Sequence, residues 1–156
     1  MDDNPDPCTE QERVLRDIVA SVREGGQGIS ILIAGAGRDR RMNAAEGIAR
    51  EAGLEVYRID LAKVVSKFIG ETEKNLQRVF EDARSTGSLL LFDEADALFS
   101  RRTEVKDSHD RFAQIDLNYL LQLIEAHRGG VIFAAKSREN LDRACLSRIR
   151  FVLEFA

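Results

Sequence analysis

The sequence predicts an α/β fold in which a parallel sheet of five strands lies between layers of helices. Two features of the chain support this prediction. Short, continuous apolar runs of strand length alternate with longer segments whose apolar residues recur at the spacing of one helix face. Glycines follow several of these segments and mark their ends. Consecutive parallel strands need a crossover between them, and the intervening helices supply it.

The strands are expected at the apolar runs 29–34, 54–59, 88–92, 131–135 and 151–155. A first helix is expected to begin with Thr9 as its N-cap and to end in the glycines that precede the first strand. A second helix is expected over 42–52, closed by Gly53. Two further helices are indicated by the apolar stripes within 76–83 and 117–124.

The composition is typical of one globular domain, with 156 residues of which 44% are hydrophobic and 32% charged. We expect a loose leader over 1–9 and one core domain over 10–156. The net charge of -4 disfavours a nucleic-acid surface, and no apolar run approaches the ~20 residues of a membrane span. The N-terminus has no apolar signal core, and Cys8 and Cys145 lack metal-type spacing, so a cytoplasmic protein with reduced thiols is predicted.

Side chains able to carry chemistry are expected at the carboxyl ends of the strands, where ligands bind in open α/β sheets. Asp93 and Glu94 follow the apolar run LLLF, and Lys136 follows the fourth strand. A carboxylate at a strand end can hold a magnesium ion through water, and the next one can orient a water molecule for attack on a γ-phosphate. Acids also occur at strand ends without a function, so the pair alone leaves both interpretations open.

The segment after the first strand fits two phosphate-binding templates incompletely. It consists of Gly35, Ala36, Gly37, Arg38, Asp39, Arg40, Arg41 and Met42. The dinucleotide template GxGxxG matches its two glycines but not the third, and Asp60 stands at the distance of a ribose-binding acid. The template GxxxxGK[ST] matches only Gly35, because the last three residues of the segment replace the glycine, the lysine and the hydroxyl residue. The segment alone does not decide the ligand.

Four segments of the chain carry a resemblance to a known family. They are SKFIGETEKNLQRVFEDAR, LLLFDEADALFSRR, NYLLQLIEAHRGGVIFAAKSRENLD and SRIRFVLEF. In their order and spacing they resemble the AAA+ ATPase family, and the resemblance extends over 60–155. It implies a sheet ordered 5-1-4-3-2 and rings of subunits that bind ATP or ADP with Mg²⁺ between them. It also implies the Walker B roles for Asp93 and Glu94, and the position of a polar sensor for Lys136.

Other candidate side chains follow from the same resemblance. The pore-loop position comprises Lys67, Phe68, Ile69 and Gly70. In the family an aromatic residue there contacts a threaded polypeptide, and a role of Phe68 in the core is the alternative. Arg148 and Arg150 stand in the arginine-finger region, where a guanidinium reaches the γ-phosphate of a neighbouring subunit; surface charges beside an edge strand are the alternative. His109 and His127 have no ligand spacing and are expected to be solvated.

The departures from the family pattern predict a degraded nucleotide site. At Arg40 a Cβ and a long stem crowd a cradle that glycine leaves open. The planar fork of Arg41 replaces a compact ammonium, and Met42 removes a hydroxyl ligand of magnesium. Asp39 adds negative charge where the ligand is negative, Lys136 replaces the sensor, and the sequence lacks the family's helical lid. The alternative is that the arginines of this segment form a solvated helix start that attracts anions.

The sequence therefore predicts an AAA+-like domain that does not hydrolyse ATP and acts as an assembly or regulatory module. Its expected partners are proteins, either copies of itself or AAA+ subunits, with a polypeptide client as a further option; neither nucleic acid nor a membrane is expected. Binding of ATP or ADP with Mg²⁺ is expected to be weak or lost. One alternative is a slow ATPase in which Arg41 and Lys136 replace the missing lysine, and another is a domain that binds nucleotide without turnover. Lys136 is expected to pair with Asp93 or Glu94 as a permanent substitute for magnesium.

Overall fold

The computed structural model describes residues 7–25, 27–59, 64, 71–96, 117–141 and 143–155. Its strands are β1 (Ile29–Ala34), β2 (Val56–Ile59), β3 (Leu89–Phe92), β4 (Gly130–Ala135) and β5 (Phe151–Glu154). Its α-helices are α1 (Pro7–Glu24), α2 (Arg38–Ala52), α4 (Glu71–Thr86), α6 (Leu117–Ala126) and α7 (Arg143–Leu146), with a 3-10 turn, η2 (Arg138–Asn140), after β4.

All strands belong to one sheet in the order β2-β3-β4-β1-β5, and every pair in it is parallel. This confirms the predicted fold class and strand order. The central pair, β1 and β4, is in register from Ile29 opposite Gly130 to Ala34 opposite Ala135. Both strands are buried along their whole length. Strands buried on both faces explain why these segments are continuous apolar runs rather than alternating ones.

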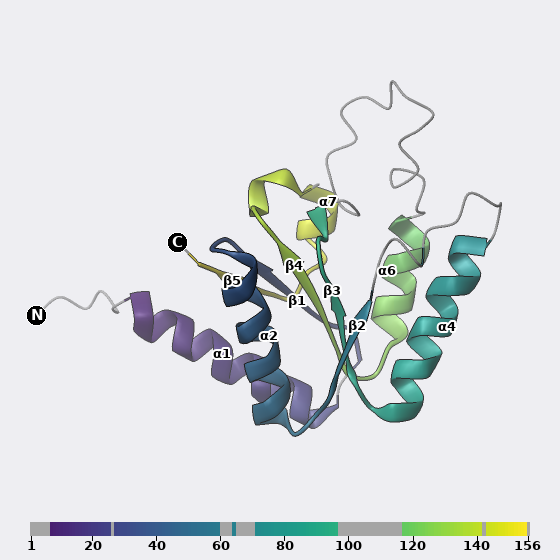
Figure 1. Cartoon of the computed structure of the whole chain (residues 1–156), viewed down its shortest axis with the longest axis horizontal. Helices are drawn as coiled ribbons and strands as arrows, with labels where there is room; N and C mark the ends of the chain where they lie inside the picture. The colour runs from purple at the N-terminus through teal and green to yellow at the C-terminus, as the bar shows by residue number, and fades with distance from the viewer. Residues whose placement is uncertain are drawn as a thin grey trace, which may run out of the picture.

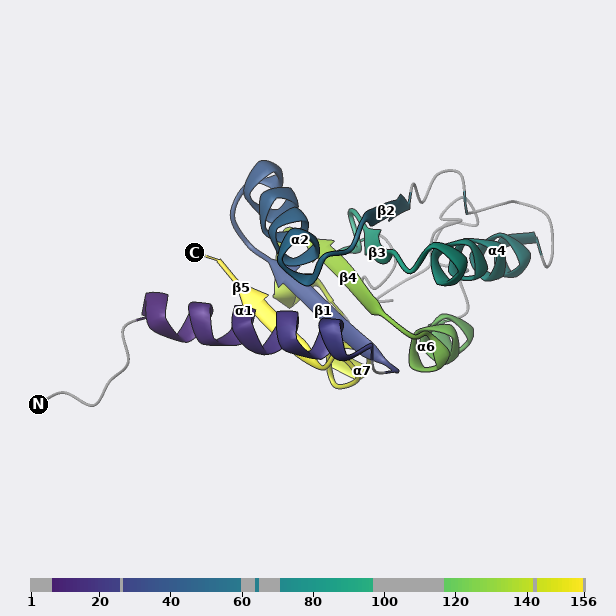
Figure 2. The same cartoon turned by 90° about the horizontal axis from the view of Figure 1, so that it is seen from below.

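The helices form a layer on each face of the sheet, which gives three layers (Figures 1 and 2). Helices α1 and α2 pack on one face with the odd-numbered residues of β1, including Ile31 and Ile33. Helices α4 and α6 pack on the other face with the even-numbered residues of β1 and with Phe92 and Phe133 of β3 and β4. The two aromatic rings stack with centroids 5.2 Å apart. Alternation of side chains along each strand therefore separates the core into two clusters.

Two helices begin earlier than the sequence indicates. Helix α1 begins at Pro7 rather than after Thr9, which suits a proline because its φ is preset for the first helical position. Helix α2 begins at Arg38 rather than at residue 42, with Gly37 as its extended N-cap residue. Arg40, at the position of a template glycine, is a good helix former, so the helix continues where a phosphate-binding loop would remain open. Gly53 closes α2 in the left-handed conformation, as predicted.

Some predictions concern residues outside the described ranges. They are residues 1–6 of the leader, Asp60, the pore-loop segment 67–70 and His109. Within the described ranges, no helix combines the length and apolar character needed to cross a bilayer.

The prediction that His127 is solvated is wrong. His127 follows α6, is 5% exposed, and lies edge-on against Phe80 with 5.4 Å between the ring centroids. Its carbonyl accepts a hydrogen bond of 3.2 Å from the amide of Gly28, which fixes the turn between α6 and β4. Burial, and then the charge of Arg84, lower the pKa of His127. The folded protein therefore favours the neutral imidazole.

Protonation of His127 should make the stability of the fold depend on pH. Because the pKa is lower in the folded state, the unfolded chain binds the proton first, at a pKa of about 6.5. The stabilisation is complete above that pH and is lost as the pH falls below it. We expect the free energy of unfolding, measured with urea between about pH 7.5 and 5.5, to decrease in the wild type and to change less in His127→Leu. His109→Gln is the control, and a slope that disappears in this control instead would contradict the assignment.

Candidate functional site

The candidate site lies where β1, β3 and β4 end. Since β4 lies between the other two strands, the segments that follow them are neighbours. The amide of Gly35 donates to the carbonyl oxygens of Ala135 at 3.3 Å and of Lys136 at 3.2 Å. The amide of Ala95, in the turn after β3, donates to the carbonyl of Ala134 at 2.9 Å. These bonds attach the loop after β1 and the turn after β3 to the same strand.

The loop between β1 and α2 is short and surrounds a guanidinium group. It contains only Gly35, Ala36 and Gly37. Nη1 of Arg41 donates to the carbonyl oxygens of Ala36 at 2.6 Å and of Gly35 at 3.2 Å. Arg41 is 5% exposed, and its Nε is buried without a hydrogen-bond partner in the described part of the chain. A phosphate-binding loop turns its N–H groups inward, whereas this loop points two carbonyl groups at a cation.

Phe155, directly after β5, closes the loop from the other side. Its amide donates to the carbonyl of Ala34 at 2.8 Å. A Cβ on Gly35 would overlap the carbonyl oxygen of Phe155, and the φ of Gly35 is +86°, so this position requires glycine. The guanidinium of Arg40 lies over the Phe155 ring, with Cζ 4.6 Å from the centroid. Arg40 is thus held at the loop by a cation–π contact.

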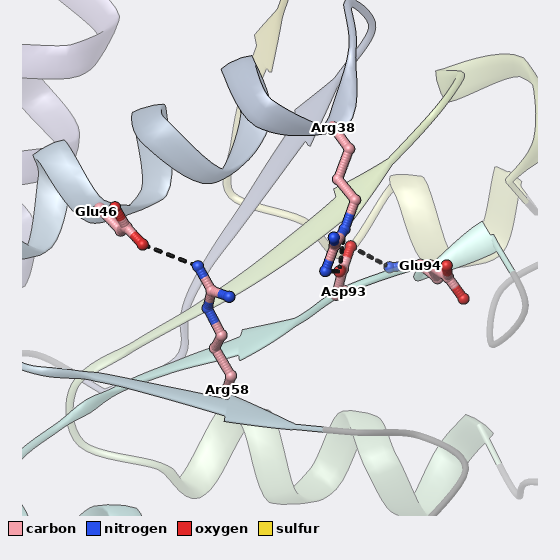
Figure 3. Close-up of polar contacts among 5 residues, drawn as sticks. All are labelled: Arg38, Glu46, Arg58, Asp93 and Glu94. Carbon is pink, nitrogen blue, oxygen red and sulfur yellow. Dashed lines mark hydrogen bonds and ion pairs between the residues drawn. The ribbon is translucent and has the colours of Figure 1, made fainter.

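Arg38 crosses from the start of α2 to the end of β3 and pairs with Asp93 (Figure 3). Its Nε and Nη2 lie 2.9 Å and 2.8 Å from Oδ2 of Asp93, while Oδ1 accepts the amide of Glu94 at 2.9 Å. The Arg38 side chain is 61% exposed and that of Asp93 is 20% exposed. The hydrogen bond to Asp93, followed by the charge of that carboxylate, raises the pKa of Arg38. Arg38 is therefore a permanent cation beside this carboxylate.

The predicted ion pair between Lys136 and Asp93 or Glu94 is wrong. Lys136 is exposed, and the ion pairs found among the described residues do not include it. Its backbone amide donates to the two carboxylate oxygens of Asp96 at 3.1 and 3.2 Å. The strand order does bring its backbone to the site. The extended start of α2 brings Arg38 to Asp93, so a different residue supplies the cation.

The site does not fit a magnesium ion bound by a strand-end carboxylate and a loop hydroxyl. Oδ2 of Asp93 already accepts a hydrogen bond from Nε of Arg38 and forms an ion pair with Nη2. Met42, at the position of the hydroxyl residue, is 6% exposed and packs in the core beneath α2. The Glu94 carboxylate points away from the Arg38–Asp93 pair (Figure 3). Within the described part of the chain, no group of three or more His, Cys, Asp or Glu side chains is placed to share a metal ion.

The charged side chains at this end of the sheet balance one another. The cations are Arg38, Arg40, Arg41 and Lys136, and the anions are Asp39, Asp93, Glu94 and Asp96. Three of the arginines lie in the first turn of α2, where the helix dipole disfavours positive charge. Asp39 in the same turn and Asp93 across the site offset that cost. These eight described side chains are formally neutral when taken together.

The arginine-finger candidates lie at the opposite end of the sheet from the other site residues. Arg148 and Arg150 precede β5, beside the amino end of β1. The Ser30 hydroxyl donates to the carbonyl of Arg148 at 3.3 Å and accepts the amide of Arg150 at 3.0 Å. Nη1 of Arg148 lies 4.0 Å from a Glu125 oxygen. Neither arginine is therefore placed to act on the loop or carboxylates of its own chain.

The comparison with known families agrees with this fold. The family model described as "ATPase family associated with various cellular activities (AAA)" matches residues 43–156. The chain belongs to this family. The matched range begins directly after Met42, so the loop segment 35–42 lies outside it. The similarity to the family therefore covers the part of the chain that follows segment 35–42.

Two curated relatives and one solved structure illustrate the similarity. The ATPase family gene 2 protein of Schizosaccharomyces pombe is 38% identical over 70% of this chain and 14% of its own length. The proteasome-activating nucleotidase of Methanococcus vannielii is 38% identical over 72% of this chain and 29% of its own length. A chain in the structure of the E. coli MS115-1 HORMA:CdnC:Trip13 complex superposes with a TM-score of 0.69 at 17% identity, covering 94% of this chain and 61% of that chain. This chain therefore spans less than a third of each curated relative named here.

Two residues of the site and one contact are not predicted by the sequence. Phe155 and Asp96 were not among the candidates, although Phe155 covers the loop and Asp96 holds the amide of Lys136. Arg38 was a candidate for phosphate, and its contact with Asp93 was not expected. Asp96 could have been found, because it lies in the same acidic string, DEAD, as Asp93. The place of Phe155 depends on where β5 ends, and the contact between Arg38 and Asp93 depends on where α2 begins.

Replacing Gly35 by alanine should destabilise the fold. The new Cβ would meet the Phe155 carbonyl at a positive φ, and such overpacking costs about 1–3 kcal/mol. Gly47→Ala is the matched control, because a Cβ there meets nothing within 4 Å inside α2. The control should gain about 0.5–1 kcal/mol from helix propensity. Urea denaturation of both variants measures the difference, and equal stability of the two would refute the close approach of Phe155.

Proposed function

We propose that this AAA domain does not turn over ATP and serves as an assembly or regulatory module. The observation that carries the proposal is the orientation of the loop after β1. Its carbonyl groups at Gly35 and Ala36 hold the guanidinium of Arg41. A phosphate at this position would face carbonyl oxygens and would have to displace a side chain that is 5% exposed.

Three further features support the same proposal. Met42 offers a thioether in the core where a metal-binding hydroxyl is needed. Asp93 is engaged by Arg38, and Lys136 offers an exposed ammonium in place of a neutral polar sensor. The first two features weaken the binding of the metal and the third weakens the positioning of the attacking water, in addition to the blocked phosphate cradle. Weak or absent binding of ATP, ADP and Mg²⁺ follows from the combination.

The proposed role as a module rests on surfaces away from this site. Arg148 and Arg150 lie at the opposite end of the sheet and are exposed, so their charge is available to a neighbouring subunit. We propose that the partners are proteins, either copies of this chain or other AAA+ subunits. The HORMA:CdnC:Trip13 complex, which contains a chain of similar fold, is itself an assembly of different proteins. A polypeptide client at 67–70 and a cytoplasmic location remain predictions from the sequence.

A slow ATPase is the second candidate, and one observation favours it. Asp93 and Glu94 directly follow a buried strand, as the acids of an active hydrolase would. In that case Arg41 and Lys136 would replace the missing lysine, and a lid would come from another chain or from a longer protein. Binding of nucleotide as a signal without turnover is a third candidate. Nucleotide binding and turnover measurements separate all three.

We expect Mg-ATP and ADP to bind the wild-type domain with dissociation constants above about 1 mM in calorimetric titrations. The combined repair Arg40→Gly, Arg41→Lys and Met42→Thr should increase the affinity, because it restores the glycine, the ammonium and the hydroxyl. The Arg58→Met variant is a control for loss of one exposed arginine, because Arg58 pairs with Glu46 away from the loop. Micromolar binding of Mg-ATP to the wild type would exclude the proposal. No gain on repair would mean that the loop backbone, with its carbonyls inward, is the remaining obstacle.

Substituting Glu94 by glutamine should leave any residual ATP hydrolysis unchanged. Glu94 can contribute to turnover only if it positions a water molecule, and its side chain points away from the Arg38–Asp93 pair (Figure 3). A phosphate-release assay on wild type and Glu94→Gln, prepared identically, measures this. A clear decrease of the rate in the variant would favour the slow ATPase instead.

A further inference from the structure

We propose that Arg38 is a built-in substitute for a divalent cation at Asp93 and keeps free divalent metal from binding at this strand end. The inference rests on the proposed function, since an active ATPase would need the same carboxylate for its metal. Two observations carry it: the contacts that occupy Asp93, and the start of α2 that places Arg38 against it.

The hydrogen bonds to Asp93 leave little room for a metal. An ionised carboxylate offers about four lone-pair positions. In this structure Nε of Arg38 uses one of them on Oδ2, and the amide of Glu94 uses one on Oδ1. Nη2 of Arg38 also lies 2.8 Å from Oδ2, so the guanidinium covers this oxygen. A divalent ion at Oδ2 would therefore have to displace the guanidinium and would be repelled by it on approach.

The residue at which α2 begins determines that Arg38 is the arginine that contacts Asp93. Gly37 is the N-cap, so Arg38 is the first helical residue and its side chain extends across the end of β4 to β3 (Figure 3). Helical geometry directs Arg41 back to the loop carbonyls and leaves Arg40 over Phe155. Each of the three arginines thus has a different partner, and only Arg38 reaches an acid at a strand end.

The pair also compensates charge within the turn after β3. Asp93 and Glu94 are adjacent, and the backbone at Glu94 has a positive φ of 57°. Two neighbouring carboxylates at one strand end repel each other unless a cation is near. Lys136 was predicted to supply that cation, and Arg38 supplies it in the structure. Because the Arg38 side chain is 61% exposed, it can be removed without opening the core.

The test compares Mn²⁺ binding to the full chain with and without Arg38. Mn²⁺ is the probe because its free concentration can be followed by electron paramagnetic resonance, and it prefers the same oxygen ligands as Mg²⁺. We expect Arg38→Met to bind Mn²⁺ more tightly than the wild type by on the order of tenfold. Adding Asp93→Asn to that variant should abolish the gain. A shift of the unfolding midpoint by Mn²⁺, seen in Arg38→Met and not in the wild type, is the second readout.

The matched control is Arg58→Met. Arg58 pairs with Glu46 at 2.8 Å, the same distance as Arg38 and Asp93, and is 53% exposed (Figure 3). This variant frees an exposed carboxylate away from the site, so an equal gain of Mn²⁺ binding there would overturn the proposal. Equal Mn²⁺ binding by wild type and Arg38→Met would also overturn it. If circular dichroism shows that Arg38→Met is unfolded, Arg38→Gln takes its place with the same expectation.

The experiment separates this inference from the proposed function. If Arg38→Met gains no Mn²⁺ while the wild type binds no nucleotide, the role of Arg38 is refuted and the proposed function stands. If the wild type binds Mg-ATP tightly, the proposed function is refuted, whatever Mn²⁺ does in the absence of nucleotide.

Discussion

The hydrogen-bonded position of β4 between β1 and β3 is the constraint on which the rest of the site depends. It places the loop at Gly35 and the turn at Asp93 on either side of one strand end, close enough for a single arginine to connect them. The early start of α2 then decides which arginine makes the connection. Phosphate chemistry needs an open loop between strand and helix, and here helical residues have replaced most of it.

The layered fold can be predicted from local patterns in the sequence. Buried runs such as Ile29–Ala34 and the helical stripe with Leu76 and Phe80 need no knowledge of distant contacts to be recognised. The strand order was inferred from the resemblance of later segments to a family, and the sheet confirms it. Gly53 marked a helix end for a local reason, the left-handed backbone that glycine tolerates.

The details of the site depended on tertiary geometry that no pattern contains. The sequence pattern places the start of the second helix at residue 42, whereas α2 begins at Arg38. The need for a cation near Asp93 was predictable from charge, but its source was not, because Lys136 and Arg38 both follow strands that end at this site. His127 was misjudged for the same reason: its burial is a property of the α6–β4 turn and its neighbours.

The attachment of the Gly35 loop to β4 has a consequence for how long the site keeps its shape. Local opening in a folded protein begins at edges and frayed ends, and fully buried central strands separate last. The Gly35 loop follows β1, the Asp93 turn follows β3, and both are hydrogen-bonded to β4 or the residue after it. These three strands are buried along their whole lengths. The contact of Arg41 with the loop carbonyls is thus next to the strands that are expected to separate last. A ligand that needed the amide of Gly35 would therefore compete with its hydrogen bonds to the carbonyls of Ala135 and Lys136.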